Sequence, residues 1–362
     1  MSIISEIIWI LALIYSCILV YFFLGICRVD RNKRSTTSHN SSVSVIVCAR
    51  NEERYIRACV ESLLTQSYPV EIIIVNDRSS DATAEILASF GDAVTVIHIT
   101  ECPAGKSPKK NALMKGIVVA KGDVLLLADA DCTMPPEWAA SMLSRYSSET
   151  GICAGLVYVR ESSLWHRLMN LELFALSACT AGAIGMGIPM IATGNNLSYR
   201  KKAYEEAGGI SPVLHIDSGD DDLMVQRIAA LDVWTYAFCT DPDSFVQTEP
   251  VGSLAAFIRQ RRRWASRGLD YPWWLIIILV CIYGMFLVFL IVPVGLALSA
   301  EWLPSLLPIG IALGMEIVVL TAGLLRFKRL RYILYYPIVK LLQVPYILIM
   351  PILGIVKGFT WK

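Results

Sequence analysis

Charged residues are scarce in this chain of 362 residues. They make up 17% of the sequence, against about 25% in an ordinary soluble domain, and hydrophobic residues rise to 55%. Charge is absent from residues 7–27 and 272–300, and a single charged residue interrupts each of the runs 302–325 and 332–356. Each run is long enough for the roughly 20 residues that a membrane helix needs. The sequence therefore predicts one N-terminal and about three C-terminal transmembrane helices.

The first apolar run also lacks the marks of a signal peptide. It has no basic n-region, its apolar core is long, and no small-residue cleavage site stands out. Basic residues follow the first run and separate the third from the fourth, whereas the loop between the second and third has Glu301 and no Lys or Arg. The positive-inside rule then places the N-terminus outside and the middle of the chain in the cytosol. Lys357 and Lys362 fall outside, against this trend. The basic residues concerned are Arg28, Arg31, Lys33, Arg34, Arg326, Lys328, Arg329 and Arg331.

No pair of the ten cysteines has CxxC spacing, and several of them lie in apolar runs. This pattern favours small core residues in a reducing compartment over a disulfide framework or a zinc site. Internal repeats and low-complexity tracts are missing as well. We expect three parts: an N-terminal transmembrane anchor (1–34), a cytosolic domain (35–271) and a C-terminal transmembrane region (272–362).

The cytosolic segment alternates between strand and helix patterns after a polar linker at residues 35–42. Strands of this kind, each followed by an amphipathic helix, predict right-handed crossovers and a parallel sheet. Ligands bind such sheets at the carboxyl ends of the strands. The predicted strands are 42–49, 70–77, 93–100 and 123–131, and the predicted helices are 51–66, 79–90 and 107–122.

Residues 164–193 form an ambiguous segment. They are rich in Leu, Ala, Gly and Met, but they also contain His166, Arg167 and Glu172 and three glycines. A fifth span here would break the charge topology. We therefore expect a cytosolic helix and loop that pack on the sheet or lie on the membrane surface.

The stretch "DVLLLADADCT" ends an apolar strand with two carboxylates, Asp129 and Asp131. Aspartate is common in loops, so the pair taken alone has an ordinary explanation. Two other strand ends also carry polar groups, namely Arg50-Asn51-Glu52 and Asp77. This convergence at one edge of a sheet favours a site in which the two carboxylates hold a divalent cation and, through it, a phosphate.

Two later stretches concentrate charge. "DSGDDDLMVQRI" begins at Asp217 and places four acids just before an apolar helix, where they could simply complement the helix dipole. "QRRRW", residues 260–264, precedes the second apolar run, where arginines and a tryptophan could simply anchor the chain at the membrane surface.

Taken in order, these stretches resemble the membrane-anchored family 2 glycosyltransferases, the group that includes cellulose, chitin and hyaluronan synthases and ceramide glucosyltransferase. The resemblance covers roughly residues 42–268. Its motifs are "SVIVCARNEE", "VNDRSSDAT", "GKSPKKNAL", "DADC" as a D-x-D, "TGNN", "GDDDL" for an E-D pair, and "QRRRW" as Q-x-x-R-W. The implied fold is α/β, a GT-A (Rossmann-like) nucleotide-sugar domain. Two departures stand out: Arg78 replaces the usual glycine after Asp77, and the extra Asp222 shifts the E-D assignment by up to one residue.

The resemblance also implies roles for individual residues. Asp129 and Asp131 hold a divalent cation (Mg or Mn) and the sugar-diphosphate, with Asp131 the stronger ligand. Asp221 is the catalytic base and Asp220 its alternative. The further donor-binding residues are Glu52, Asp77 and Lys106, and the residues on the acceptor and diphosphate side are Gln260, Arg263 and Trp264.

The expected function is inverting, metal-dependent sugar transfer from a nucleotide-diphosphate sugar, by an integral protein of the inner or plasma membrane with a cytosolic catalytic domain. About four spans are few for a glycan channel, so a lipid acceptor is favoured over a glycan acceptor in polysaccharide elongation. No nucleic-acid partner is implied. A membrane scaffold or transporter is the alternative of another class, although few polar positions in the spans argue against a transport path.

Two charges lie at membrane depth. Glu316 is nine residues from Leu325 and Lys340 is eight from Tyr332, so at about 1.5 Å per residue their depths differ by only about 1.5 Å. Ionisable groups at this depth are usually paired. We expect an ion pair between them, with Gln343 as a third member; the alternative is that Lys340 reaches up to the headgroups.

Overall fold

The computed structural model describes residues 3–29, 41–216, 219–266, 268 and 270–356. The chain divides into two compact units. The helical unit contains Met1–Cys27, Ser163–Gly182 and Val251–Phe359, and the sheet unit contains Arg28–Ser162 and Ala183–Pro250. The predicted division at residues 34 and 271 cuts the chain into consecutive segments, whereas these units group residues that contact one another. Two segments of the predicted cytosolic part, 163–182 and 251–271, therefore belong to the helical unit.

The sheet unit is built on a seven-stranded sheet with the order β3-β2-β1-β4-β8-β6-β9. The first four of these strands are parallel, which confirms the predicted alternation. β8 runs antiparallel to both β4 and β6, so the sheet is mixed. The strands are β1 (Val43–Ala49), β2 (Glu71–Asp77), β3 (Thr95–Ile99), β4 (Val124–Asp129), β6 (Thr150–Gly155), β8 (Leu197–Arg200) and β9 (Thr235–Cys239).

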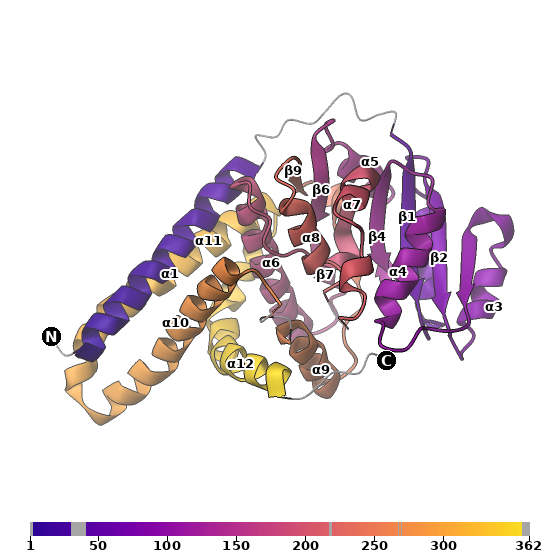
Figure 1. The fold of residues 1–362 in the computed structure, drawn as a ribbon. Helices are drawn as coiled ribbons and strands as arrows, with labels where there is room; N and C mark the ends of the chain where they lie inside the picture. Colours follow the sequence, from indigo (N-terminus) through magenta and orange to yellow (C-terminus); the bar gives the residue numbers. More distant parts are fainter. Residues whose placement is uncertain (1–2, 30–40, 217–218, 267, 269, 357–362) are drawn as a thin grey trace. The chain divides into compact units, whose positions relative to one another are not determined.

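Helices follow the parallel strands as predicted, and α4 covers β1 and β2 (Figure 1). The helix after β1 begins at Ile56 rather than at the predicted residue 51. Asn51 has a positive φ of 56°, and its side-chain oxygen accepts a hydrogen bond from the Ser80 amide at 2.8 Å, so a turn comes first. The helices are α2 (Ile56–Leu64), α3 (Thr83–Ala88), α4 (Pro108–Val119), α5 (Trp138–Leu143), α7 (Lys201–Glu206) and α8 (Asp222–Ala229); a small sheet orders β5 (Cys132–Thr133), β10 (Val246–Thr248) and β7 (Val157–Val159).

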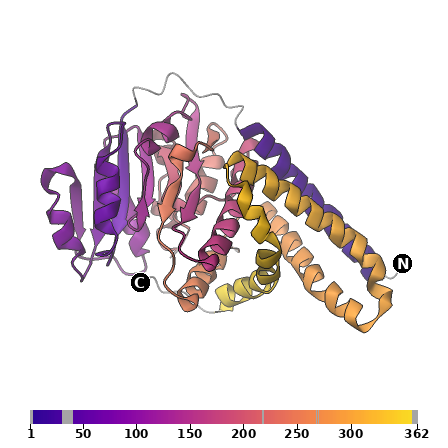
Figure 2. The same ribbon diagram turned by 180° about the vertical axis from the view of Figure 1, so that it is seen from behind.

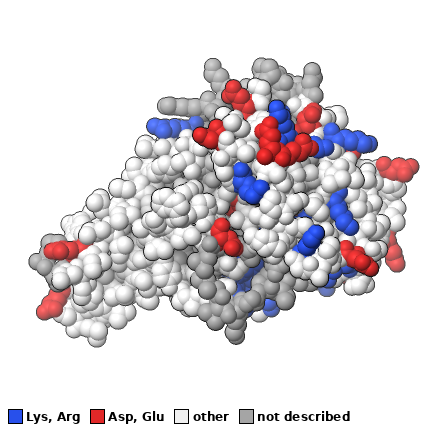
Figure 3. All heavy atoms as spheres, in the orientation of Figure 1, with Lys and Arg blue, Asp and Glu red and all other residues white. Residues whose placement is uncertain are grey.

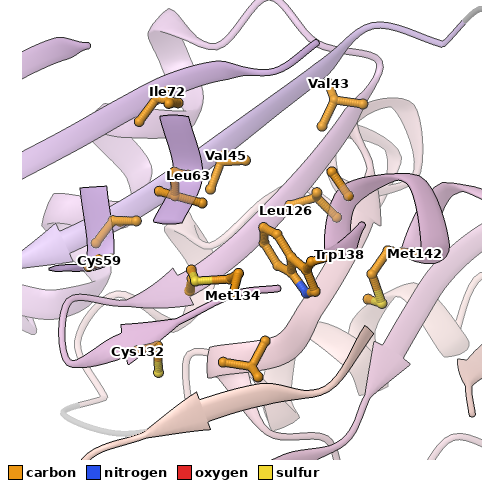
Figure 4. Packing of buried hydrophobic residues seen from close by; sticks show 14 of the residues in the cluster. Val43, Val45, Cys59, Leu63, Ile72, Leu126, Cys132, Met134, Trp138 and Met142 are labelled. Carbon is orange, nitrogen blue, oxygen red and sulfur yellow. The ribbon is translucent and has the colours of Figure 1, made fainter. Parts of the chain in front are cut away.

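A hydrophobic core packs against the sheet and fixes the strand ends. Trp138 of α5 packs in one cluster with Leu126 of β4 and with Met142 (Figure 4). Its indole N–H donates to the Asn196 side-chain oxygen at 2.9 Å, so the ring is buried without losing a hydrogen bond. Each large apolar side chain buried in this way contributes about 1.5–3 kcal/mol. Strand β4 is therefore held firmly up to its last residue, Asp129.

The helical unit consists of long helices. Among the residues that the structure describes, five helices are long and apolar enough to cross a membrane. α1 runs beside α11 in both views (Figures 1 and 2), and the face of these helices shown in Figure 3 carries few charged side chains. The helices are α1 (Ile3–Arg28), α6 (Leu164–Gly185), α9 (Leu254–Ala265), α10 (Trp273–Leu298), α11 (Leu306–Arg326) and α12 (Tyr336–Val356).

Helix α6 differs from the other four candidate spans. Its most apolar stretch is 72% buried, against 28–33% for the others. A Cβ on Gly25 of α1 would meet the backbone of Gly182 of α6, a Cβ on Gly182 would meet the backbone of Phe22, and Ala178 packs directly on Gly323 of α11. The segment 163–182 thus packs among the long helices of its own unit, and its cytosolic placement stays a prediction.

The predicted ion pair between Glu316 and Lys340 is confirmed. The lysine Nζ lies 2.6 Å from Glu316 Oε1. The hydroxyl of Tyr15 donates to the same oxygen at 2.6 Å, and that of Tyr336 donates to Oε2 at 2.7 Å. The predicted third member, Gln343, was wrong, because the two tyrosines take that place. We name these four side chains the Glu316 cluster.

Candidate active site

The first part of the candidate site lies at the carboxyl edge of the parallel strands. Asp129 ends β4, whose preceding residues are all buried, and its side chain is 37% exposed. Asp131 follows the buried Ala130 in the turn after β4, and its carboxylate lies close enough to Asp129 for the two charges to repel each other. β1 and β2 end in the same direction as β4. The predicted convergence of polar strand ends therefore holds for the backbone.

Lys109 connects this edge with the acidic run. Its Nζ lies 3.0 Å from Asp129 Oδ1 and 3.1 Å from Asp220 Oδ2. Sequence reasoning selected Lys106 instead, which is exposed in the loop before α4. Lys109 sits in the first turn of α4, which Pro108 begins. Lys109 could have been identified from the sequence by its place in the first turn of the helix that follows the third predicted strand.

The acidic run is anchored by backbone amides. Asp221 precedes α8, and its Oδ1 accepts from the Asp222 amide at 2.8 Å. Its Oδ2 accepts from the Gly194 amide, also at 2.8 Å, which ties the run to the "TGNN" turn. The Asp222 carboxylate accepts from the Ala192 amide at 3.0 Å. Two of the three consecutive acids thus stabilise the local backbone, while Asp220 faces Lys109; Asp217 lies outside the described residues.

The electrostatics of the site are dominated by desolvation and mutual repulsion. Burial and then the neighbouring Asp129 raise the pKa of Asp131 from 3.8 to about 6. Burial and then Asp220 also raise the pKa of Asp221. Lys109 pulls both pKa values down without reversing either shift. The site therefore holds more negative charge than its lysine neutralises, and an added cation would relieve it.

The acids fit a divalent cation as a partial ligand set. No group of three or more His, Cys, Asp or Glu side chains in the described ranges could hold a metal ion alone. Mg²⁺, however, is commonly bound by one or two carboxylates together with substrate phosphates. Asp129 and Asp131 supply such oxygens, and the Lys109 ammonium already stands at 3.0 Å from one of them. The donor set fits a cation that arrives with a phosphate ligand.

Asp77, a predicted donor-binding residue, is buried and paired. Its side chain is 1% exposed and accepts two bonds from the Arg78 guanidinium, at 2.8 and 3.1 Å. Arg78 has a φ of 55°, the conformation for which the usual glycine is suited. The pairing with Asp77 raises the pKa of Arg78. Glu52 follows β1, and its amide donates to the Thr83 hydroxyl at 2.9 Å.

The remaining predicted site residues, Gln260, Arg263 and Trp264, lie on α9 of the helical unit. These three residues therefore belong to a different unit from the predicted donor-binding acids. Their predicted roles are not tested by these contacts. Arg261, which sequence reasoning passed over, is the most deeply buried arginine of this stretch, with 1% exposure.

A mixed sheet with a parallel half, and a lysine between acids at its carboxyl edge, define an α/β protein with a site at the strand ends that fits a cation together with a phosphate ligand. Residues 44–208 match the model of Glycosyl transferase family 2. This segment of the chain therefore carries a glycosyltransferase domain of that family.

The chain is also similar to curated relatives. The chain is 27% identical over 341 residues to a beta-monoglucosyldiacylglycerol synthase of Nostoc sp., covering 83% of this chain and 68% of the relative. It is 26% identical over 279 residues to a poly-beta-1,6-N-acetyl-D-glucosamine synthase of Staphylococcus epidermidis, covering 73% and 62%. The chain thus spans about two thirds of these relatives' length.

Among solved structures, a mannosyltransferase from Pyrobaculum calidifontis in complex with GDP-Man and Mn²⁺ has a TM-score of 0.56. It is 16% identical, and the match covers 93% of this chain and 99% of that one. At this identity the likeness shows a shared fold. The predicted fold class, a GT-A domain with apolar helices at both ends of the chain, is confirmed.

Proposed function

We propose that the protein transfers a sugar from a nucleotide-diphosphate sugar to a membrane lipid, with inversion at the anomeric carbon and with a divalent cation. The observation that carries the proposal is the double contact of Lys109 with Asp129 and Asp220, because it joins the D-x-D stretch to the acidic run in one place. Donor anchoring and proton removal both need charged groups there.

In the proposed reaction, the acceptor hydroxyl oxygen attacks the anomeric carbon and the bond from that carbon to the diphosphate oxygen breaks. The hydroxyl proton passes to a carboxylate. The diphosphate departs with the bonding electron pair, and a single displacement inverts the centre. A cation held by Asp129 and Asp131 would neutralise the leaving diphosphate. Lys109 adds a fixed positive charge beside the same group.

The base in this proposal is Asp220. Asp221 was the first choice from the sequence, but both of its oxygens accept backbone amides that hold α8 and the turn before β8. Asp220 instead faces Lys109, which also contacts Asp129. A base must reach the acceptor hydroxyl, so the acid beside the donor-binding group is better suited. Asp221 then positions the run.

A lipid acceptor is favoured by two observations. The relative that covers most of this chain among the two described above is named for glucosyldiacylglycerol synthesis. Four of the candidate spans, excluding α6, remain few for a channel that threads a polymer. Polysaccharide elongation is the second candidate, and the poly-N-acetylglucosamine synthase among the relatives keeps it open.

For the arrangement in the cell, we propose that residues 1–34 and 272–362 hold the protein in the inner or plasma membrane and that residues 35–271 lie in the cytosol. Arg28 at the end of α1 and Arg326 at the end of α11 support this side as cytosolic. In this arrangement α6 and α9 are cytosolic-side helices of the helical unit.

The test is a donor panel assayed with purified full-length protein, total lipid extract and Mg²⁺ or Mn²⁺, with products resolved by mass. We expect one donor to give a lipid that is heavier by one sugar and metal dependence that chelation abolishes. Products that grow by many sugars would instead support polysaccharide elongation. Neither transfer nor donor hydrolysis with any common donor would support a membrane scaffold or transporter.

A further inference from the structure

Arg261 is the centre of a buried polar contact in the helical unit. Its side chain is 1% exposed, and its NH2 donates to Glu172 Oε2 of α6 at 2.7 Å. The same carboxylate accepts the Tyr346 hydroxyl of α12. One guanidinium and one carboxylate thus tie three helices of this unit together.

The same guanidinium holds two residues of the "QRRRW" stretch. Its carbon lies 3.9 Å from the centroid of the Trp264 ring and 4.6 Å from that of Phe257, both on α9. Residues 257, 261 and 264 fall on one face of a helix. The NH1 group donates to the side-chain oxygen of Gln260 at 3.1 Å. The rotamers of Gln260 and Trp264 are therefore fixed by a residue between them.

Phe257 is itself locked in place. Its ring meets Trp165 of α6 edge-on, with centroids 5.2 Å apart, and lies 6.2 Å from the ring of Tyr346. A planar guanidinium can stack on aromatic rings and bond a carboxylate at once, which a lysine ammonium cannot reproduce. The environment thus selects arginine for its shape as well as for its charge.

We infer that Arg261 is a positioning residue for the transfer reaction, anchored by Glu172, and that it acts by fixing Trp264 and Gln260. The inference rests on the proposed function. Donor binding, by contrast, is placed on acids of the sheet unit. Loss of Arg261 should therefore reduce transfer to the acceptor far more than metal-dependent hydrolysis of the bound donor.

The experiment compares Arg261→Lys with Arg259→Lys, an exposed arginine on the same helix. We expect Arg261→Lys to lower transfer by about 10- to 100-fold, as small misplacements do, with donor hydrolysis and donor KM within about threefold of wild type. Arg259→Lys should behave as wild type. Glu172→Gln, which leaves Arg261 without its anionic partner, should show the same split with a smaller loss.

A double-mutant cycle tests whether Arg261 acts through Trp264. If it does, the loss of transfer in Arg261→Lys with Trp264→Phe is smaller than the two single losses combined. Additive losses, wild-type transfer in Arg261→Lys, or an equal fall of transfer and hydrolysis would each overturn the inference. Absence of both activities in the wild type would instead contradict the proposed function.

A spectroscopic measurement does not require turnover. The emission of Trp264 is obtained as the difference between proteins with Trp264 and with Trp264→Phe. We expect that emission to move to longer wavelength in the Arg261→Lys background, because the ring loses its stacked partner and meets more water. An unchanged difference spectrum would also overturn the inference.

Discussion

In the helical unit, Glu316 has both carboxylate oxygens engaged by donors, and Lys340 has its ammonium 3.9 and 4.2 Å from the rings of Phe289 and Phe286. In the sheet unit, Asp131 has a raised pKa although Lys109 is near. The first group is balanced within the protein, and the second is not. A buried charge that is fully paired favours one packing of helices, whereas a surplus of one sign indicates a missing ligand of the other sign.

The largest expected effect separates the two acids of the run. Asp220→Asn should lower transfer by about 10²- to 10⁴-fold, because it removes the base, while donor and metal binding remain. Asp221→Asn should reduce activity less and lower thermal stability, because an Asn side chain can accept only one of the two amides. Rates and donor binding of the two variants are measured side by side. If Asp221→Asn has no transfer activity and Asp220→Asn remains active, the base is Asp221 and not Asp220.

The second prediction concerns the balanced group. Glu316→Gln and Lys340→Met should each destabilise the protein in detergent by up to about 3–5 kcal/mol, because each leaves a buried charge without its partner. The double variant should recover most of that loss. Thermal unfolding midpoints of the four proteins form the cycle. Two single variants as stable as wild type would show that the Glu316 cluster does not hold the helices together.

The matched double change in the sheet unit gives the contrast. Lys109→Met with Asp220→Asn also removes one charge of each sign, but it should not restore activity, because those charges serve the ligand rather than each other. Recovered transfer in this double variant would remove the distinction between the two groups.

The third prediction concerns pH. The pKa of Asp131 near 6 exceeds its ordinary value of 3.8, so the metal-free folded protein favours the neutral carboxyl more strongly than the unfolded chain does. This contribution to stability is complete below about pH 4 and is lost as pH rises through 6, with a size on the order of 2 kcal/mol or less because the side chain is only partly buried. The affinity for a cation has the opposite pH dependence, because a protonated Asp131 is a poor ligand, and it should decrease at pH values under about 6.

This pH dependence is checked by thermal unfolding at pH 5 and pH 7.5, with and without Mn²⁺, in wild type and Asp131→Asn. The metal-free wild type should gain stability at the lower pH, and Mn²⁺ should stabilise it at the higher pH alone. Asp131→Asn should show neither dependence. A variant that binds Mn²⁺ and donor as wild type does would contradict the metal role of Asp131.

The smallest effect is expected at Arg78. Arg78→Gly relieves the cost of a left-handed backbone conformation, which is unfavourable for arginine by roughly 1 kcal/mol, but it also removes the two bonds to Asp77. We expect stability to change by less than about 1 kcal/mol and donor KM to change more clearly. A donor KM equal to that of the wild type would separate the Asp77–Arg78 pair from donor binding.

The sequence predicted those features that depend on periodicity. Strands β1 to β4 and their helices follow from apolar runs bounded by turns, and the pairing of Glu316 with Lys340 follows from equal depth in adjacent helices. Rotation about a helix axis is not encoded in this way. For that reason the sequence predicted Gln343 as the third member of the buried pair, where the structure has Tyr15 and Tyr336.

Contacts between segments that are distant in the chain were also missed. Tyr15 reaches Glu316 from a helix 301 residues away in sequence, and Glu172 reaches Arg261 across 89 residues. No local pattern specifies such neighbours, because they depend on how whole helices pack. The antiparallel insertion of β8 between β4 and β6 is of the same kind.

The left-handed backbone at Arg78 has a consequence for the history of the gene. A position that is strained for every side chain, and relaxed for glycine, should drift toward glycine wherever nothing opposes the change. An arginine that persists there in sister sequences would then record continued selection on its guanidinium. A scatter of other residues among them would record a relic that the lineage is losing.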